Sequence, residues 1–148
     1  MASMKQSGRT SLVTLATAVL VIVVVVVLSF GKESLTSVGA RFMTALSKGD
    51  VDTLTKMSLL GDKTEPEMHK EWEFAVNTAG KHYRFFWRIT SELVSDENSG
   101  SVRMQISRNI DSPSTYEEAF QLPMQKVNGE WKVDVRGISR EMFPALPR

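Results

Sequence analysis

A run of twenty residues without a single charged side chain, residues 11–30, constrains this chain more than any other feature. It reads SLVTLATAVLVIVVVVVLSF, and from Leu12 to Leu28 thirteen residues are Leu, Ile or Val. As an α-helix it would be about 30 Å long, which matches the hydrocarbon core of a bilayer. An isolated strand could not satisfy its backbone N–H and C=O groups in lipid. The sequence therefore predicts a transmembrane helix over residues 11–30.

The charges around this run predict its orientation. Residues 1–10 carry Lys5 and Arg9 and no acidic residue, and positive flanks stay in the cytoplasm. We expect a single-pass protein of the cytoplasmic membrane, with residues 1–10 inside and the rest of the chain in the periplasm or extracellular space. A cleaved signal peptide is the alternative, because residues 29–31 (Ser-Phe-Gly) resemble a cleavage site, and a mitochondrial presequence is another. The length of the apolar run favours an uncleaved anchor.

The remaining residues predict one domain, 38–148, behind a short connector, 31–37. The chain has no cysteine, which excludes disulfides and thiolate metal sites. From residue 31 onward there are 16 Lys and Arg against 17 Asp and Glu, a net charge of −1. A domain this neutral lacks the basic surface of a nucleic-acid-binding protein, so we expect no nucleic acid partner.

Helical periodicity governs the first half of this domain. Val38, Phe42, Ala45 and Leu46 share one helical face, and Gly49 and Asp50 end that helix and cap a second one. A third helix opens at a Thr64–Glu67 capping box and is expected to continue to about residue 79. The residues expected to face the core from the second and third helices are Val51, Leu54, Met57, Met68, Trp72, Ala75 and Ala79.

From residue 81 the period changes to two, which predicts four antiparallel strands. Asn128-Gly129 is a strong signal for the turn of the last hairpin. The residues expected to face inward are Tyr83, Phe85, Trp87 and Ile89, then Val102, Met104 and Ile106, then Tyr116, Phe120, Leu122 and Met124, and finally Trp131, Val133 and Val135. The predicted fold class is α+β, with three helices packed on one face of a curved four-stranded antiparallel sheet.

Two segments resemble the nuclear transport factor 2-like superfamily, whose fold is a cone of helices wrapped by a bent sheet. Residues 40–50 (ARFMTALSKGD) look like its opening helix, Gly-Asp break and second helix, and residues 120–137 look like its closing hairpin. The chain also resembles the small family of cytochrome oxidase assembly and inner-membrane translocase tether proteins. Anchored members of such families imply a non-enzymatic role as a binding or assembly subunit of a membrane complex.

The resemblance also implies an alternative, a small-molecule-binding or isomerase-like cone, because isomerase members use a carboxylate in an apolar pocket. Glu118 is in phase with inward residues, and Tyr83 and Tyr116 would line the same pocket. A pairing of Glu118 with Arg or Lys is the structural explanation that competes with this one. The superfamily's full isomerase set of one Tyr and two Asp is not visible here.

Strand alternation places Phe86 on the opposite, outer face, between Arg84 and Arg88. An exposed aromatic side chain beside arginines is typical of a protein-docking surface. Met142, Phe143 and Leu146 are further apolar residues that we expect to be exposed. His69 and His82 are the only histidines, and neither has carboxylates at metal-ligand spacing. We therefore expect no catalytic residues, no metal and no cofactor.

Overall fold

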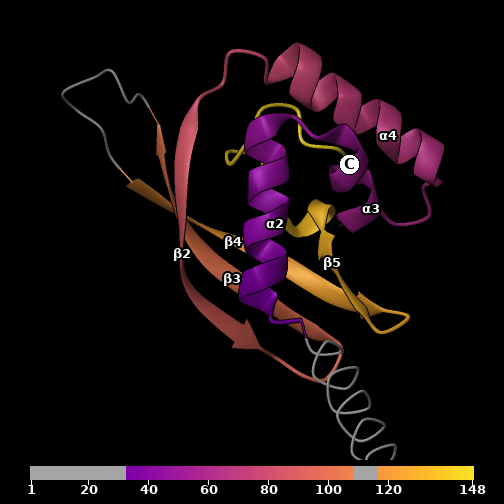
Figure 1. Ribbon diagram of the computed structural model, residues 1–148, viewed down its shortest axis with the longest axis vertical. Helices are drawn as coiled ribbons and strands as arrows, with labels where there is room; N and C mark the ends of the chain where they lie inside the picture. The colour runs from indigo at the N-terminus through magenta and orange to yellow at the C-terminus, as the bar shows by residue number, and fades with distance from the viewer. Residues whose placement is uncertain (1–32, 109–116) are drawn as a thin grey trace, which may run out of the picture. The chain divides into compact units, whose positions relative to one another are not determined.

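Three helices open the part of the chain that the computed structural model describes, residues 33–108 and 117–148. They are α2 (Leu35–Lys48), α3 (Val51–Met57) and α4 (Glu65–Phe74) (Figure 1). Helix α2 begins inside the segment predicted as a connector, because the Ser34 hydroxyl accepts a hydrogen bond from the Ser37 N–H (3.1 Å) and caps the helix. Gly49 ends α2 at φ 69°, as predicted.

The third helix changes its winding before it ends. After α4 the chain continues as a π-helix, η1 (Ala75–Ala79), closed by a hydrogen bond from the Gly80 N–H to the Ala75 carbonyl (2.7 Å). Because the π-helix has more residues per turn than the α-helix, the inward face shifts. Ala75 and Val76 are buried, whereas Ala79, predicted to face the core, is exposed.

The sheet has five strands, not the four predicted. They are β1 (Ser58–Leu59), β2 (Phe85–Val94), β3 (Ser99–Arg108), β4 (Glu117–Val127) and β5 (Glu130–Asp134), in the order β1-β5-β4-β3-β2. The extra strand β1 pairs in parallel with β5, so the sheet is mixed; the other pairs are antiparallel. Asn128 and Gly129 form the β4–β5 turn with φ of 52° and 82°, as the sequence predicted.

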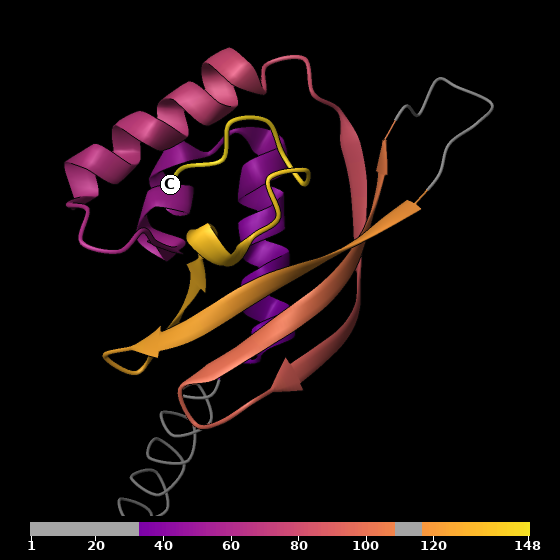
Figure 2. The same ribbon diagram turned by 180° about the vertical axis from the view of Figure 1, so that it is seen from behind.

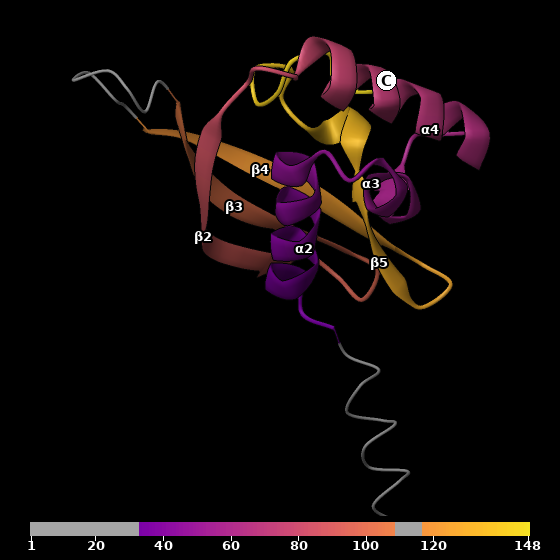
Figure 3. The same cartoon turned by 45° about the horizontal axis from the view of Figure 1, so that its top comes forward.

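The core lies between the helices and one face of this sheet (Figure 3). Val38, Phe42 and Leu46 on α2 are nearly inaccessible to solvent, as are Val102, Met104 and Ile106 on β3. Phe120, Leu122 and Met124 on β4 complete this layer. The alternation predicted for β3 and β4 is confirmed at these positions, and on β2 Phe85, Trp87 and Ile89 are partly buried against the core. Tyr116 lies outside the described residues.

The tryptophan at the centre of the core is Trp72, not Trp131. Trp72 is fully buried, contacts Phe42 edge to face (ring centroids 5.8 Å apart), and donates its indole N–H to the Ser58 hydroxyl (2.9 Å). Trp131 has the predicted inward phase but is only partly buried, because it lies near the end of the sheet, with Lys126 over its ring at 5.0 Å.

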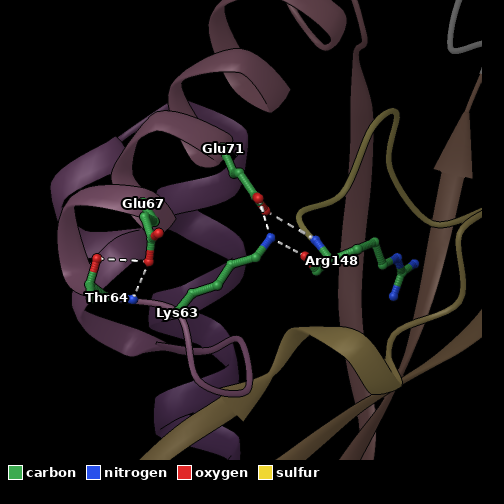
Figure 4. Close-up of polar contacts among 5 residues, drawn as sticks. All are labelled: Lys63, Thr64, Glu67, Glu71 and Arg148. Atoms are coloured by element: carbon green, nitrogen blue, oxygen red, sulfur yellow. Dashed lines mark hydrogen bonds and ion pairs between the residues drawn. The ribbon is translucent and has the colours of Figure 1, made fainter.

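The predicted exposure of the tail residues Met142, Phe143 and Leu146 is wrong, since all three are at most 7% exposed. After β5 and the 3-10 turn η2 (Val135–Gly137), the chain returns over the helices. Phe143 packs edge to face on Tyr83. Figure 4 shows the end of the chain held at Arg148, whose N–H donates to Glu71 and whose carbonyl accepts from Lys63.

The predicted membrane helix, residues 11–30, lies outside the described residues. Among the helices of residues 33–108 and 117–148, none has the length and apolarity required to cross a bilayer. Residues Ser34–Arg148 form one compact unit.

Candidate functional site

The structure brings Glu118 and Tyr83 together through a residue that the sequence analysis did not select, Arg108. The Arg108 guanidinium forms an ion pair with Glu118 (2.8 Å) and lies 5.7 Å from the Tyr83 ring centroid and 5.3 Å from that of Phe120. It also donates to the Glu141 carbonyl. The Glu118 side chain is about one-third exposed. Arg108 therefore neutralises the candidate pocket carboxylate, which is the structural alternative considered for Glu118.

Tyr83 is a hydrogen-bond donor in this cluster. Burial raises the pKa of Tyr83 above its usual 10.0; the positive charge of Arg108 opposes this rise and the negative charge of Glu118 adds to it. The phenol therefore stays protonated at neutral pH and donates to the Met142 carbonyl (3.1 Å). Tyr116, the third predicted pocket residue, lies outside the described residues.

Strand phase in the sequence could have identified Arg108 as an inward-facing residue. It is in phase with Val102, Met104 and Ile106, so it points to the same side of the sheet as Glu118 on the neighbouring strand. Two opposite charges on the inward phase of paired strands predict an ion pair rather than two separate polar residues.

Phe86 lies on the outer face of the sheet, which no described helix covers (Figure 2). Its side chain is 62% exposed, although its strand neighbours Phe85 and Trp87 pack against the core. Arg84 and Arg88 flank it and are exposed, as predicted. Arg88 forms an ion pair with Glu117 of β4 (2.9 Å). The structure thus brings the three predicted docking residues to one surface.

The strand partners of Phe86 place small or polar side chains around it. Phe86 is opposite Ser107 on β3, and Ser107 is opposite Glu117 on β4. The next cross-strand row contains Arg88, Gln105 and Ala119. A partner that covers the exposed ring would therefore meet the small side chains of Ser107 and Ala119, and beside them the exposed Arg88–Glu117 pair.

Glu118 lines none of three hollows that described residues form. The largest, about 550 Å³, lies between the end of α2, η1, the start of β2 and the tail. Within residues 33–108 and 117–148, no three His, Asp or Glu side chains gather as ligands for a metal ion. The absence of a metal or cofactor remains a prediction.

Comparison with known proteins gives structural similarities only. No family model matches the chain, and no curated protein matches it in sequence. Similar solved structures include a ketosteroid isomerase-like protein from Erwinia carotovora atroseptica, with 13% identity, a TM-score of 0.49, and coverage of 67% of this chain and 87% of that one. Another is an NTF-2 like protein of unknown function from Shewanella oneidensis, with 11% identity, a TM-score of 0.47, and coverage of 65% and 88%. At these TM-scores and identities we draw no inference about activity or ligands.

Proposed function

We propose that this chain is a membrane-anchored, non-enzymatic binding domain of the nuclear transport factor 2-like type. Its role is to dock a protein subunit of a membrane complex outside the cytoplasm. The observation that carries the proposal is the 62% exposure of Phe86 on an uncovered sheet face, where folding gives no reason for a large aromatic side chain. The apolar run 11–30 supports the anchor, and Lys5 and Arg9 before it support a domain outside the cytoplasm.

The chemistry of this face favours one kind of partner. Arg84 places a positive charge on one side of an apolar ring, and on the other side Arg88 is paired with Glu117. A partner segment that carries an apolar side chain with Asp or Glu nearby would bury the ring and match the charge of Arg84. The ion pair of Glu118 with Arg108 favours binding at the outer face over isomerase-like chemistry in the cone, because that carboxylate is already engaged.

The structure offers a matched pair of exposed phenylalanines for the test. Phe86 on the sheet is 62% exposed, and Phe74 on α4 is 56% exposed. A photo-crosslinking side chain is introduced at either position in the full chain, in intact membranes. Position 86 should capture a defined partner and position 74 should not.

Binding of the purified partner is then measured for Phe86→Ala and Phe74→Ala. We expect the first substitution to weaken binding by about 2 kcal/mol or more and the second to leave it unchanged. Both variants should fold normally, because surface substitutions cost within about 1 kcal/mol. Equal binding by Phe86→Ala and wild type, or crosslinking of position 86 only to a second copy of the chain, would refute the docking of a partner subunit on this face. Loss of binding in Glu118→Gln alone would favour the cone instead.

A further inference from the structure

The hollow of about 550 Å³ is the largest of the three hollows described above. Figure 1 shows its components meeting at one end of the unit: the C-terminal end of α2, the loop before β2, and the tail. Leu46, Val76 and Phe143, each at most 7% exposed, supply apolar side chains at its base. Its volume falls in the range of about 300–1,000 Å³ that is usual for small-molecule sites.

The charges around this hollow are of one sign. Lys48, Lys81 and Arg84 all line it, and no Asp or Glu does. The other lining residues are Ser47, Gly49, Asn77, Gly80 and Tyr83. From residue 31 onward the sequence has a net charge of −1, so three cations without an acid do not reflect a generally basic surface. Concave walls around charges of one sign concentrate their field and attract ions of the opposite sign.

Among the described residues, Lys48, Lys81 and Arg84 have no evident structural role. In the described part of the chain, none of the three side chains forms an ion pair or a hydrogen bond with another residue. The end of α2 does not need Lys48 as a cap, because backbone N–H groups of Gly49 and Asp50 bond to the carbonyls of Leu46 and Ala45. The nearest acid to Lys48 in sequence is Asp50, whose pKa is lowered mainly by hydrogen bonds from Thr53; the charge of Lys48 adds to this lowering without a direct ion pair. The three positive charges are therefore available to a ligand.

We propose that this hollow binds a small organic anion, a molecule with a phosphate or carboxylate group attached to an apolar body. The anionic group lies among Lys48, Lys81 and Arg84, and the apolar body faces the base formed by Leu46, Val76 and Phe143. This hollow is separate from the docking face around Phe86. Arg84 lies between the two surfaces: it lines the hollow and also flanks Phe86. Ligand binding here does not depend on the docking function proposed above.

The test uses phenyl phosphate as the probe, with phenol and inorganic phosphate as its two halves. Binding to the full chain in neutral detergent is followed by isothermal titration calorimetry at low salt. We expect phenyl phosphate to bind more tightly than either half. Each substitution Lys48→Gln, Lys81→Gln or Arg84→Gln should weaken binding about two- to fivefold, and the triple variant by more than about tenfold. Added salt should weaken binding further.

Matched controls decide where the probe binds. Lys56→Gln and Lys132→Gln remove cations that do not line the hollow, and both should leave phenyl phosphate binding unchanged. Phe86→Ala should also leave it unchanged, which separates this site from the docking face. No detectable binding at millimolar phenyl phosphate, equal loss in the control variants, or equally tight binding of phenol would each overturn the proposal.

Discussion

Substitution of Trp72 tests the packing of the core most directly. Its indole N–H donates to the Ser58 hydroxyl, and that hydroxyl donates in turn to the Leu54 carbonyl (2.6 Å). Trp72, Ser58 and Leu54 are all buried. In Trp72→Phe the ring still reaches Phe42, but the N–H hydrogen bond, about 1 kcal/mol, and part of the ring's packing are lost. We expect a total cost of about 2 kcal/mol.

Ser58→Ala provides the second half of a double-mutant cycle. It leaves the buried indole N–H without an acceptor, which costs about 1–3 kcal/mol. In Trp72→Phe/Ser58→Ala no orphaned N–H remains. The double variant should therefore be more stable than the sum of the single effects predicts, by about 1 kcal/mol. The assay is urea unfolding of residues 34–148, followed by circular dichroism.

Trp131→Ala supplies the contrast. Because Trp131 is only partly buried, we expect a loss of about 1–2 kcal/mol, below the roughly 3–5 kcal/mol of a fully buried tryptophan. Additive single effects in the cycle would refute the Trp72–Ser58 hydrogen bond. A larger loss for Trp131→Ala than for Trp72→Ala would refute the placement of the core.

Two further predictions concern the helices. The Thr64 N–H and hydroxyl both bond to Glu67 (2.8 Å each; Figure 4), and they lower the pKa of Glu67 below its usual 4.5. A lowered pKa in the folded state contributes stability that is present above pH 4.5 and is lost as the pH falls through the folded pKa. The urea midpoints measured at about pH 6 and about pH 3 should therefore differ less in Glu67→Gln than in wild type or in the control Glu65→Gln. An unchanged difference between the two midpoints would contradict the capping box. Gly80→Ala should destabilise the fold by about 1–3 kcal/mol, since its Cβ would lie 2.4 Å from Phe143 and 2.8 Å from the Ala75 carbonyl oxygen; a thermal melt like that of wild type would show that the π-helical end relaxes at no cost.

Regular periodicity explains why so much of the fold was predictable. Residues with a period of two or 3.6 were assigned to the correct face on α2, β2, β3 and β4, because a shift of one residue would expose a whole apolar set. Turn and capping residues such as Asp50 and Asn128-Gly129 were also informative, since their backbone requirements are local.

The errors lie where no period exists or where the period changes. Strand β1 has only two residues, too few to alternate, and it is defined by its partner β5. The tail residues Phe143 and Leu146 follow no repeat, so their burial depends on the tertiary contacts of a returning chain. Ala79 was misplaced because nothing in the local sequence distinguishes π from α winding.

The candidate sites were predictable to different degrees for a physical reason. Exposure of Phe86 follows from strand phase alone, so the sequence sufficed. The hollow, in contrast, needs Lys48, Lys81 and Phe143 from three distant segments, and only the folded chain brings them together.

The contacts of Arg108 indicate a structural role for the charged residues on the inner face of the sheet. Glu118 faces a guanidinium that also lies against the rings of Tyr83 and Phe120 and donates to the tail at Glu141. These contacts tie β3, β4 and the tail together, which is a structural use of an inward charge pair. Both of our binding proposals accordingly concern other surfaces, the Phe86 face and the basic hollow.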